Sequence, residues 1–420
     1  MPARSSGSSV RGASHTSVRI VGLALFAQFG LFGMIMSSWM SRIPSIREAL
    51  DVTALQLGSM LIAGGIGSLL GAFIVGGFVA RFGSRVILLA GIVGNTLGFG
   101  LLAASVLLPS QPLFLLGMAL NGACGAFINV PININAAAYE RQIGRTVLPQ
   151  FHAAFSIGAA AGAFSASLFS AAGISAGAQV IVMTGAITLL RVLTLRASCQ
   201  PTAQKARTAT PQRTRGAFRS ALAAWAEPRT IMLGVVLLAG SLSEGTAGTW
   251  LSLAVVDGYA QPEAIGAAVY ATFLGAMTVF RITGVRLIDR FGRVWVLRIS
   301  GAVVLVGVLL FIFGGTLPLA WSGVVLWGMG AALGVPIAIA AASDDPEHAG
   351  QRVAVVTSFS TIASLAAPPL LGLLVDQVGV LTSLLVVAAA AVISLSFSSA
   401  VRRSELSVVT TQTAPVRIAE

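Results

Sequence analysis

The chain has 420 residues, of which 56% are hydrophobic and only 10% charged, with a mean hydropathy of +0.89 and a formal net charge of +12. This composition excludes an ordinary soluble domain and indicates a protein whose solvent is lipid. The positive charge is spread over many short loops and lacks a motif that would present it to nucleic acid. We therefore expect no nucleic-acid partner, but a cytoplasmic face that suits the anionic headgroups of a lipid bilayer.

Twelve apolar segments follow one another, each near the roughly 20 residues that a spanning helix needs. They cover residues 18–40, 54–80, 86–107, 110–137, 149–171, 174–197, 229–255, 263–287, 294–315, 317–342, 352–375 and 379–401. We predict an all-α, multi-pass membrane protein with both termini in the cytoplasm. In this orientation, Arg42 and Arg47 are the only two of the 26 lysines and arginines on the outer side, as the preference of basic residues for the cytoplasm requires.

The segments fall into two groups of six, joined by a stretch rich in threonine, proline and arginine that is typical of a linker. The expected organisation is a cytoplasmic tail (1–17), a six-helix half (18–197), a basic cytoplasmic linker (198–228), a second six-helix half (229–401) and a second cytoplasmic tail (402–420). The excess of arginine over lysine, with abundant alanine and glycine, favours a bacterial cytoplasmic membrane.

In the first half, polar side chains gather in the fourth segment. Asn129 and Asn133 are four residues apart and share one helix face, and Pro131 can open the backbone between them. With Asn121, and with Gln28 in the first segment, they are candidates for a cavity that binds a polar solute. The alternative, in which these amides only hold neighbouring helices together, stays open.

His152 begins the fifth segment near the predicted cytoplasmic mouth, where a gating or capping role fits it better than a central proton site.

In the second half, Glu244 is the only carboxylate near the middle of an apolar segment, about 20 Å from either end. A carboxyl group at that depth is costly and is therefore a candidate for exchanging protons, although a neutral hydrogen-bond donor or a fixed partner for an arginine would also explain it. Arg281 lies about a turn and a half inside its segment. It can either extend to the headgroups or turn inward toward an acidic solute or Glu244.

Three sequence matches indicate that the halves are repeats. The RFG triplets at Phe82 and Phe291 lie 209 residues apart, and the Val-Pro pairs at Pro131 and Pro336 lie 205 apart. Trp39 and Trp250, which we expect to anchor the outer membrane interface, lie 211 apart. Three matches in the same order at nearly one offset favour duplicated halves, an architecture typical of transporters.

With these features the chain resembles the major facilitator superfamily, over residues 18–401. That family carries a G-x-x-x-D-R-x-G-R-R loop between helices two and three and a weaker copy between helices eight and nine. Both are present here, but Ala80 stands where the first copy should have its aspartate. The two copies supply Gly76, Arg81, Gly83, Arg85, Asp289, Arg290, Gly292 and Arg293.

The loop residues fit a cytoplasmic hinge, in which the glycines allow a tight turn and the charges form a latch. The alternative is that the arginines only mark the cytoplasmic side. Further stretches, such as SSWMSRIPSIREAL and EGTAGTWL, resemble a bacterial branch near the fucose-type sugar permeases, whose substrates are mostly unassigned.

The sequence contains no nucleotide-binding loop, metal-ligand cluster or nucleophile-and-base constellation, so we expect neither an enzyme nor a cofactor or metal. The resemblance implies a monomeric secondary transporter of a small, polar solute, and the depth of Glu244 favours coupling to protons. An efflux antiporter, or a membrane sensor of the same fold that transports nothing, are the alternatives.

Overall fold

The computed structural model describes residues 15–199, 224–345 and 348–402. Most of the predicted tails and of the predicted linker lies outside the described residues, and residues 15–17 of the first predicted tail already belong to a helix.

The N-terminal half forms six long helices and one short one. They are α1 (His15–Met40), α2 (Ile43–Leu50), α3 (Ala54–Phe82), α4 (Ser84–Leu107), α5 (Gln111–Ile143), α6 (Leu148–Ala171) and α7 (Ala176–Ser198). Helix α2 was not predicted from the sequence, because it is amphipathic and too short to span a membrane. Its Ile43, Ile46 and Leu50 are buried, and Pro44 opens its first turn, where a missing N–H costs nothing.

The C-terminal half is less regular, because two of its spans are broken. Its elements are α9 (Pro228–Tyr259), α10 (Glu263–Phe291), α11 (Arg293–Phe313), α12 (Leu317–Ala331), α13 (Gly334–Ala342), α14 (Ala349–Val378), α15 (Val380–Ser383), α16 (Leu385–Ser396) and the 3₁₀ turn η2 (Ser398–Val401). The break between α12 and α13 falls in front of Pro336, because proline cannot donate the next helical hydrogen bond.

Among the described residues, eleven helices are long and apolar enough to cross a membrane, and the apolar stretch Val380–Ser396 is shorter. Together they confirm the prediction of twelve spans in an all-helical protein. Several helices run beyond their predicted ends: α5 continues to Ile143 and α9 to Tyr259. Hydropathy marks only the lipid-facing part of a helix, whereas the backbone stays helical until a residue such as Gly144 ends it with a positive φ of 67°.

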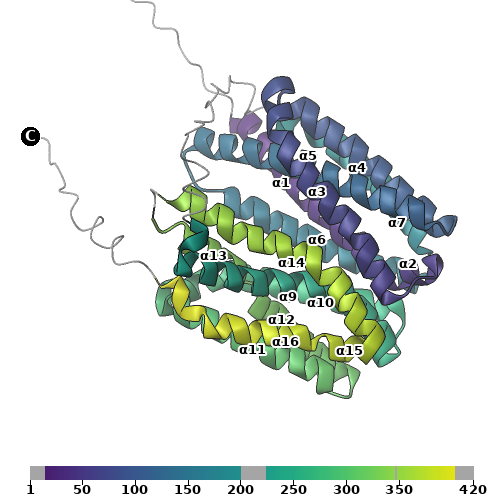
Figure 1. Ribbon diagram of the computed structural model, residues 1–420. Helices are drawn as coiled ribbons and strands as arrows, with labels where there is room; N and C mark the ends of the chain where they lie inside the picture. Colours follow the sequence, from purple (N-terminus) through teal and green to yellow (C-terminus); the bar gives the residue numbers. More distant parts are fainter. Residues whose placement is uncertain (1–14, 200–223, 346–347, 403–420) are drawn as a thin grey trace, which may run out of the picture.

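The two halves lie side by side as two bundles with separate hydrophobic cores, and two pairs of long helices join them (Figure 1). In these pairs α6 packs against α10 and α3 packs against α14. We call the two ends of the molecule the Arg42 end, which holds the α1–α2 turn and α15, and the Asp289 end, which holds the loop motifs and α13. The positive charge of the loops predicts that the Asp289 end is cytoplasmic.

The tryptophan prediction was wrong. The side chains of Trp39 and Trp250 are only 7% and 0% exposed, so neither lies at a lipid interface. Each packs into the core of its own half, because tertiary packing and not depth along the helix decides which way a side chain faces.

Candidate functional site

An ion pair between two helices of the C-terminal half lies deep in the bundle. Glu244 is the midpoint of α9, about 23 Å from either end. Its Oε2 lies 3.5 Å from Nη2 of Arg281 on α10, and the two side chains are 39% and 31% exposed. Of the two directions predicted for Arg281, the structure shows the inward one. Exposed charges so far from the helix ends border open space, and no side chain fills the space beside Gly245 or Gly275.

Arg281 is held in place by the broken span. Its Nε donates to the backbone carbonyl of Ala332 at 3.1 Å, and its Nη2 lies 3.6 Å from the sulfur of Met277. In an unbroken helix that carbonyl would accept from the residue four positions later, which is Pro336 and has no N–H. The Val-Pro pair found in the sequence therefore frees a carbonyl, and the arginine uses it.

Two further polar side chains, from α6 and α10, experience the charges of the ion pair. The charge of Arg281 acts on His152 of α6, which is exposed and packs edge-on against Phe29 at a centroid distance of 5.4 Å. The Tyr270 hydroxyl bonds to Ser37 of α1 and experiences the charge of Glu244. The site therefore includes groups from both halves.

The asparagines of α5 divide into two sets. Asn133 Nδ2 donates to Asn129 Oδ1 at 2.7 Å, and the Asn129 side chain is exposed. Asn129 lies one turn after Gly125, which is near the ring of Phe32 in α1. These two remain candidates for the solute site.

Asn121 and Gln28 are 7% and 0% exposed and contact neighbouring helices instead. Asn121 accepts from Asn95 of α4, while Gln28 donates to the backbone of Arg191 and to Thr194 in α7. This geometry is that of the interhelical alternative, and we leave both residues out of the proposed site.

Both copies of the loop motif have the same backbone shape. Gly83 and Gly292 have φ of 81° and 77° with ψ of 157° and 159°, a conformation that favours glycine. In each copy the arginine stacks on the next phenylalanine, Arg81 on Phe82 at 5.2 Å and Arg290 on Phe291 at 5.4 Å. The predicted tight turns are confirmed.

The two copies differ in their ionic contacts. Arg293 Nη1 lies 2.7 Å from Asp344, whose other oxygen is 3.2 Å from Arg229, so the second copy is tied to its own half. Arg85 is exposed and makes no ion pair with another described residue. Gly76 has open space beside it, and Asp289 is exposed and contacts no other polar group among the described residues. A latch through Asp289 is thus not formed in this structure.

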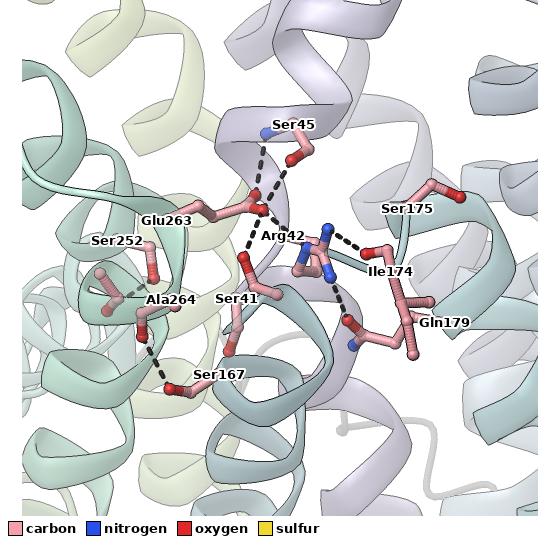
Figure 2. Close-up of polar contacts among 12 residues, drawn as sticks. Ser41, Arg42, Ser45, Ser167, Ile174, Ser175, Gln179, Ser252, Glu263 and Ala264 are labelled. Carbon is pink, nitrogen blue, oxygen red and sulfur yellow. Dashed lines mark hydrogen bonds and ion pairs between the residues drawn. The ribbon is translucent and has the colours of Figure 1, made fainter. Parts of the chain in front are cut away.

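The Arg42 end holds a buried polar cluster that sequence reasoning missed (Figure 2). Arg42 is fixed by its own half, because its Nη1 donates to Gln179 at 2.7 Å and its Nη2 to the carbonyl of Ile174 at 2.9 Å. Glu263, the first residue of α10, enters from the other half and places Oε2 2.8 Å from Arg42 Nε. Ser45 adds hydrogen bonds to both carboxylate oxygens, at 2.9 and 2.6 Å.

Burial lowers the pKa of the Arg42 guanidinium, and the adjacent Glu263 carboxylate counteracts this effect. The pair is therefore fully compensated only while the halves are in contact. The signal available in the sequence was that Arg42 and Arg47 are the two basic residues on the outer side, which we had used only to set the topology.

Two more carboxylates of the C-terminal half bind the N-terminal half at this end. Asp257 lies 2.8 Å from Arg47, and Asp376 accepts from the backbone N–H groups of Ala54 and Leu55 at 3.1 and 3.0 Å. These are the first two amides of α3, which otherwise would lack partners. Three carboxylates of one half thus close the Arg42 end against cations and amides of the other.

Helices α3 and α14 diverge toward the Asp289 end. Gly58, Gly65 and Gly76 lie on one stripe of α3, because 18 residues make about five turns. Gly58 has no room for a Cβ against Pro368, and Gly65 abuts Leu365, whereas nothing lies beside Gly76. The halves therefore touch at Gly58, near the Arg42 end, and are apart at Gly76, which lies about 27 Å farther along α3.

Comparisons with known proteins agree with this architecture. A family model described as Major Facilitator Superfamily matches residues 20–271 and again residues 233–415. The uncharacterized transporter y4wD of Sinorhizobium fredii is 30% identical over 362 residues, which cover 83% of this chain and 90% of the relative.

Two solved structures show the same fold. A variant of the nucleoside transporter NupG covers 92% of this chain and 100% of its own, with 14% identity and a TM-score of 0.75. A variant of the fucose:proton symporter FucP of E. coli has the same coverage, with 13% identity and a TM-score of 0.60. The chain therefore belongs to the major facilitator superfamily and, like the curated relatives named as transporters, is a multi-pass membrane transporter and not an enzyme.

Proposed function

We propose that this transporter is a secondary active one, which moves a small polar solute by alternating access and couples that movement to protons through Glu244. The observation that carries the proposal is the exposed ion pair of Glu244 and Arg281 at mid-helix depth. Charges at that depth persist where they serve a pathway for ions or solutes.

The contacts between the halves support alternating access. Carboxylates and donors of opposite halves meet at the Arg42 end, whereas the ion pairs of Asp344 at the Asp289 end stay within one half. This is the pattern of a state closed on one side and open on the other. With the predicted topology it is the inward-open state.

The proton step follows from the geometry of the ion pair. A charged Glu244 is attracted to Arg281, and a protonated one is not, so taking up a proton separates the two side chains. The similar structures described as fucose:proton and D-xylose-proton symporters support a coupling of this kind.

Proteoliposomes that contain the purified protein and a trapped pH-sensitive dye test the proposal. A panel of sugars, polyols, nucleosides and sugar acids is added outside, and for at least one solute we expect a protein-dependent acidification of the lumen. Glu244→Gln should abolish the acidification. Glu48→Gln, which makes the same change at an exposed carboxylate of α2, should preserve it. Full acidification by the Glu244 variant, or none by the wild type with any solute, would overturn the proposal.

A further inference from the structure

We infer that the solute carries a carboxylate group and that this carboxylate takes the place of Glu244 on Arg281. The inference rests on the proposed function, because it takes the ion pair to be the solute site. It adds the chemical class of the solute and the order in which the charges exchange.

Only one member of the ion pair is fixed. Arg281 is held by the Ala332 carbonyl and the Met277 sulfur in addition to Glu244. Glu244 makes no other ion pair or hydrogen bond with a described residue, and its one contact is 3.5 Å long, beyond ordinary hydrogen-bond length. The guanidinium therefore stays in place, and the carboxylate is the partner that can be replaced.

The free edge of the Arg281 guanidinium is complementary to a carboxylate. Backbone binding uses the Nε–H of Arg281, which leaves the Nη1 and Nη2 edge for a planar, two-oxygen partner. Among the described residues, no carboxylate other than Glu244 pairs with Arg281, so no further negative charge competes for the guanidinium. An uncharged solute would give Arg281 only hydrogen bonds in exchange for Glu244, whereas a carboxylate also restores the opposite charge.

Binding of a solute carboxylate also explains why Glu244 would take up a proton. Once a solute carboxylate occupies Arg281, Glu244 is left without a counter-charge at mid-helix depth, where an uncompensated charge is expensive. Glu244 then takes up one proton. One solute carboxylate and one proton thus enter the site together, with no change in its net charge.

Equilibrium binding to the full-length purified protein, without any gradient, tests the inference. Thermal stabilisation is measured with sodium acetate, lactate, gluconate and galacturonate, with galactose and sorbitol as the uncharged counterparts, and with sodium chloride and inorganic phosphate as ionic controls. We expect at least one carboxylate to stabilise the protein and its uncharged counterpart to fail. Stabilisation by none of the carboxylates, by phosphate alone, or by acid and neutral counterpart alike would overturn the inference.

Variants of the ion pair sharpen the test. Arg281→Gln should weaken binding of the carboxylate by at least tenfold, and Arg286→Gln, at an exposed position of the same helix, should leave it unchanged. Glu244→Gln should strengthen binding, because the competing carboxylate is gone.

The pH dependence gives a readout that does not require Arg281→Gln to fold. Because binding takes up a proton, the wild-type Kd should rise as pH rises, with a limiting slope of tenfold per pH unit, and Glu244→Gln should show no such slope. Equal slopes in the two proteins would contradict the exchange. If carboxylates bind but no proton-coupled uptake occurs, the proposed function is contradicted and this inference is not. If proton-coupled uptake occurs only with uncharged solutes, this inference is contradicted and the proposed function is not.

Discussion

The two ends of the bundle differ in the polar contacts between the two halves. At the Arg42 end, Glu263, Asp257 and Asp376 of the C-terminal half bind cations and amides of the N-terminal half. At the Asp289 end, the arginines of the second loop motif pair within their own half or stack on a neighbouring ring. One end is a complementary interface, and the other is predominantly basic on both sides.

Closing the Asp289 end therefore has an electrostatic requirement that the Arg42 end already meets. Both loop motifs place arginines at this end, Arg81 and Arg85 in one half and Arg290 and Arg293 in the other, so closing it concentrates positive charge that an acidic group would offset. Asp289 is exposed and has no polar contact among the described residues, so it is available for that role. The corresponding position in the first motif is Ala80, which has no charge to contribute.

The largest effect on this comparison is expected from Arg42→Ala. Removing one member of a buried ion pair leaves Glu263, only 12% exposed, without its counter-charge, at a cost of about 3 kcal/mol. Amide hydrogen exchange in residues 41–57 and 257–268 should accelerate by roughly 100-fold. The matched change Arg47→Ala removes a pair that is 29% and 32% exposed and should cost less than about 1 kcal/mol. Equal acceleration by both variants would show that depth of burial does not govern closure.

Asp344→Asn is expected to lower stability without opening the Arg42 end. Asp344 is 7% exposed and pairs with both Arg293 and Arg229, so its loss leaves two cations without their shared carboxylate, at a cost of about 2 kcal/mol. The melting temperature should fall, while hydrogen exchange at residues 41–57 keeps its wild-type rate. Faster exchange there would mean that the two ends are mechanically coupled.

Asp376→Asn should loosen the Arg42 end by about 1 kcal/mol, the usual contribution of a side chain that caps a helix. The amide oxygen can still accept one of the two hydrogen bonds from Ala54 and Leu55, but the NH2 group cannot accept the other, and the attraction of a charge for the helix N-terminus is lost. Hydrogen exchange in residues 54–60 measures the change. Gln56→Ala, which removes a cap within the same half, is the control and should not affect the contact between the halves.

The smallest effect is expected at the open end. Asp289→Ala should slow transport about two- to fivefold, which corresponds to one exposed ionic contact in the closed Asp289 end. Ala80→Asp should improve the rate by less than that, because the first motif lacks the anchoring that Asp344 gives to the second. Transport rates at matched expression compare the two. Unchanged rates in both variants would leave the motif charges as topology markers.

The features that could be predicted from the sequence are those that depend on local pattern. Length and hydropathy specify the twelve spans, and the repeated RFG triplet specifies two turns whose glycines have almost identical dihedral angles. The depth of Glu244 also followed from counting residues along one helix. Each of these is a property of a single segment, because the pitch of a helix and the thickness of a bilayer are fixed.

Which side chains meet depends on how distant helices pack, and this could not be predicted from local pattern. Ser45 and Glu263 are 218 positions apart, and no periodicity reports that they touch. The same holds for Arg281, which turns inward because a carbonyl freed by Pro336 lies within its reach, and for Gln28, which turns into the N-terminal core instead of an open space. A polar residue in an apolar helix indicates that a partner is needed, but the packing of distant helices determines which residue that partner is.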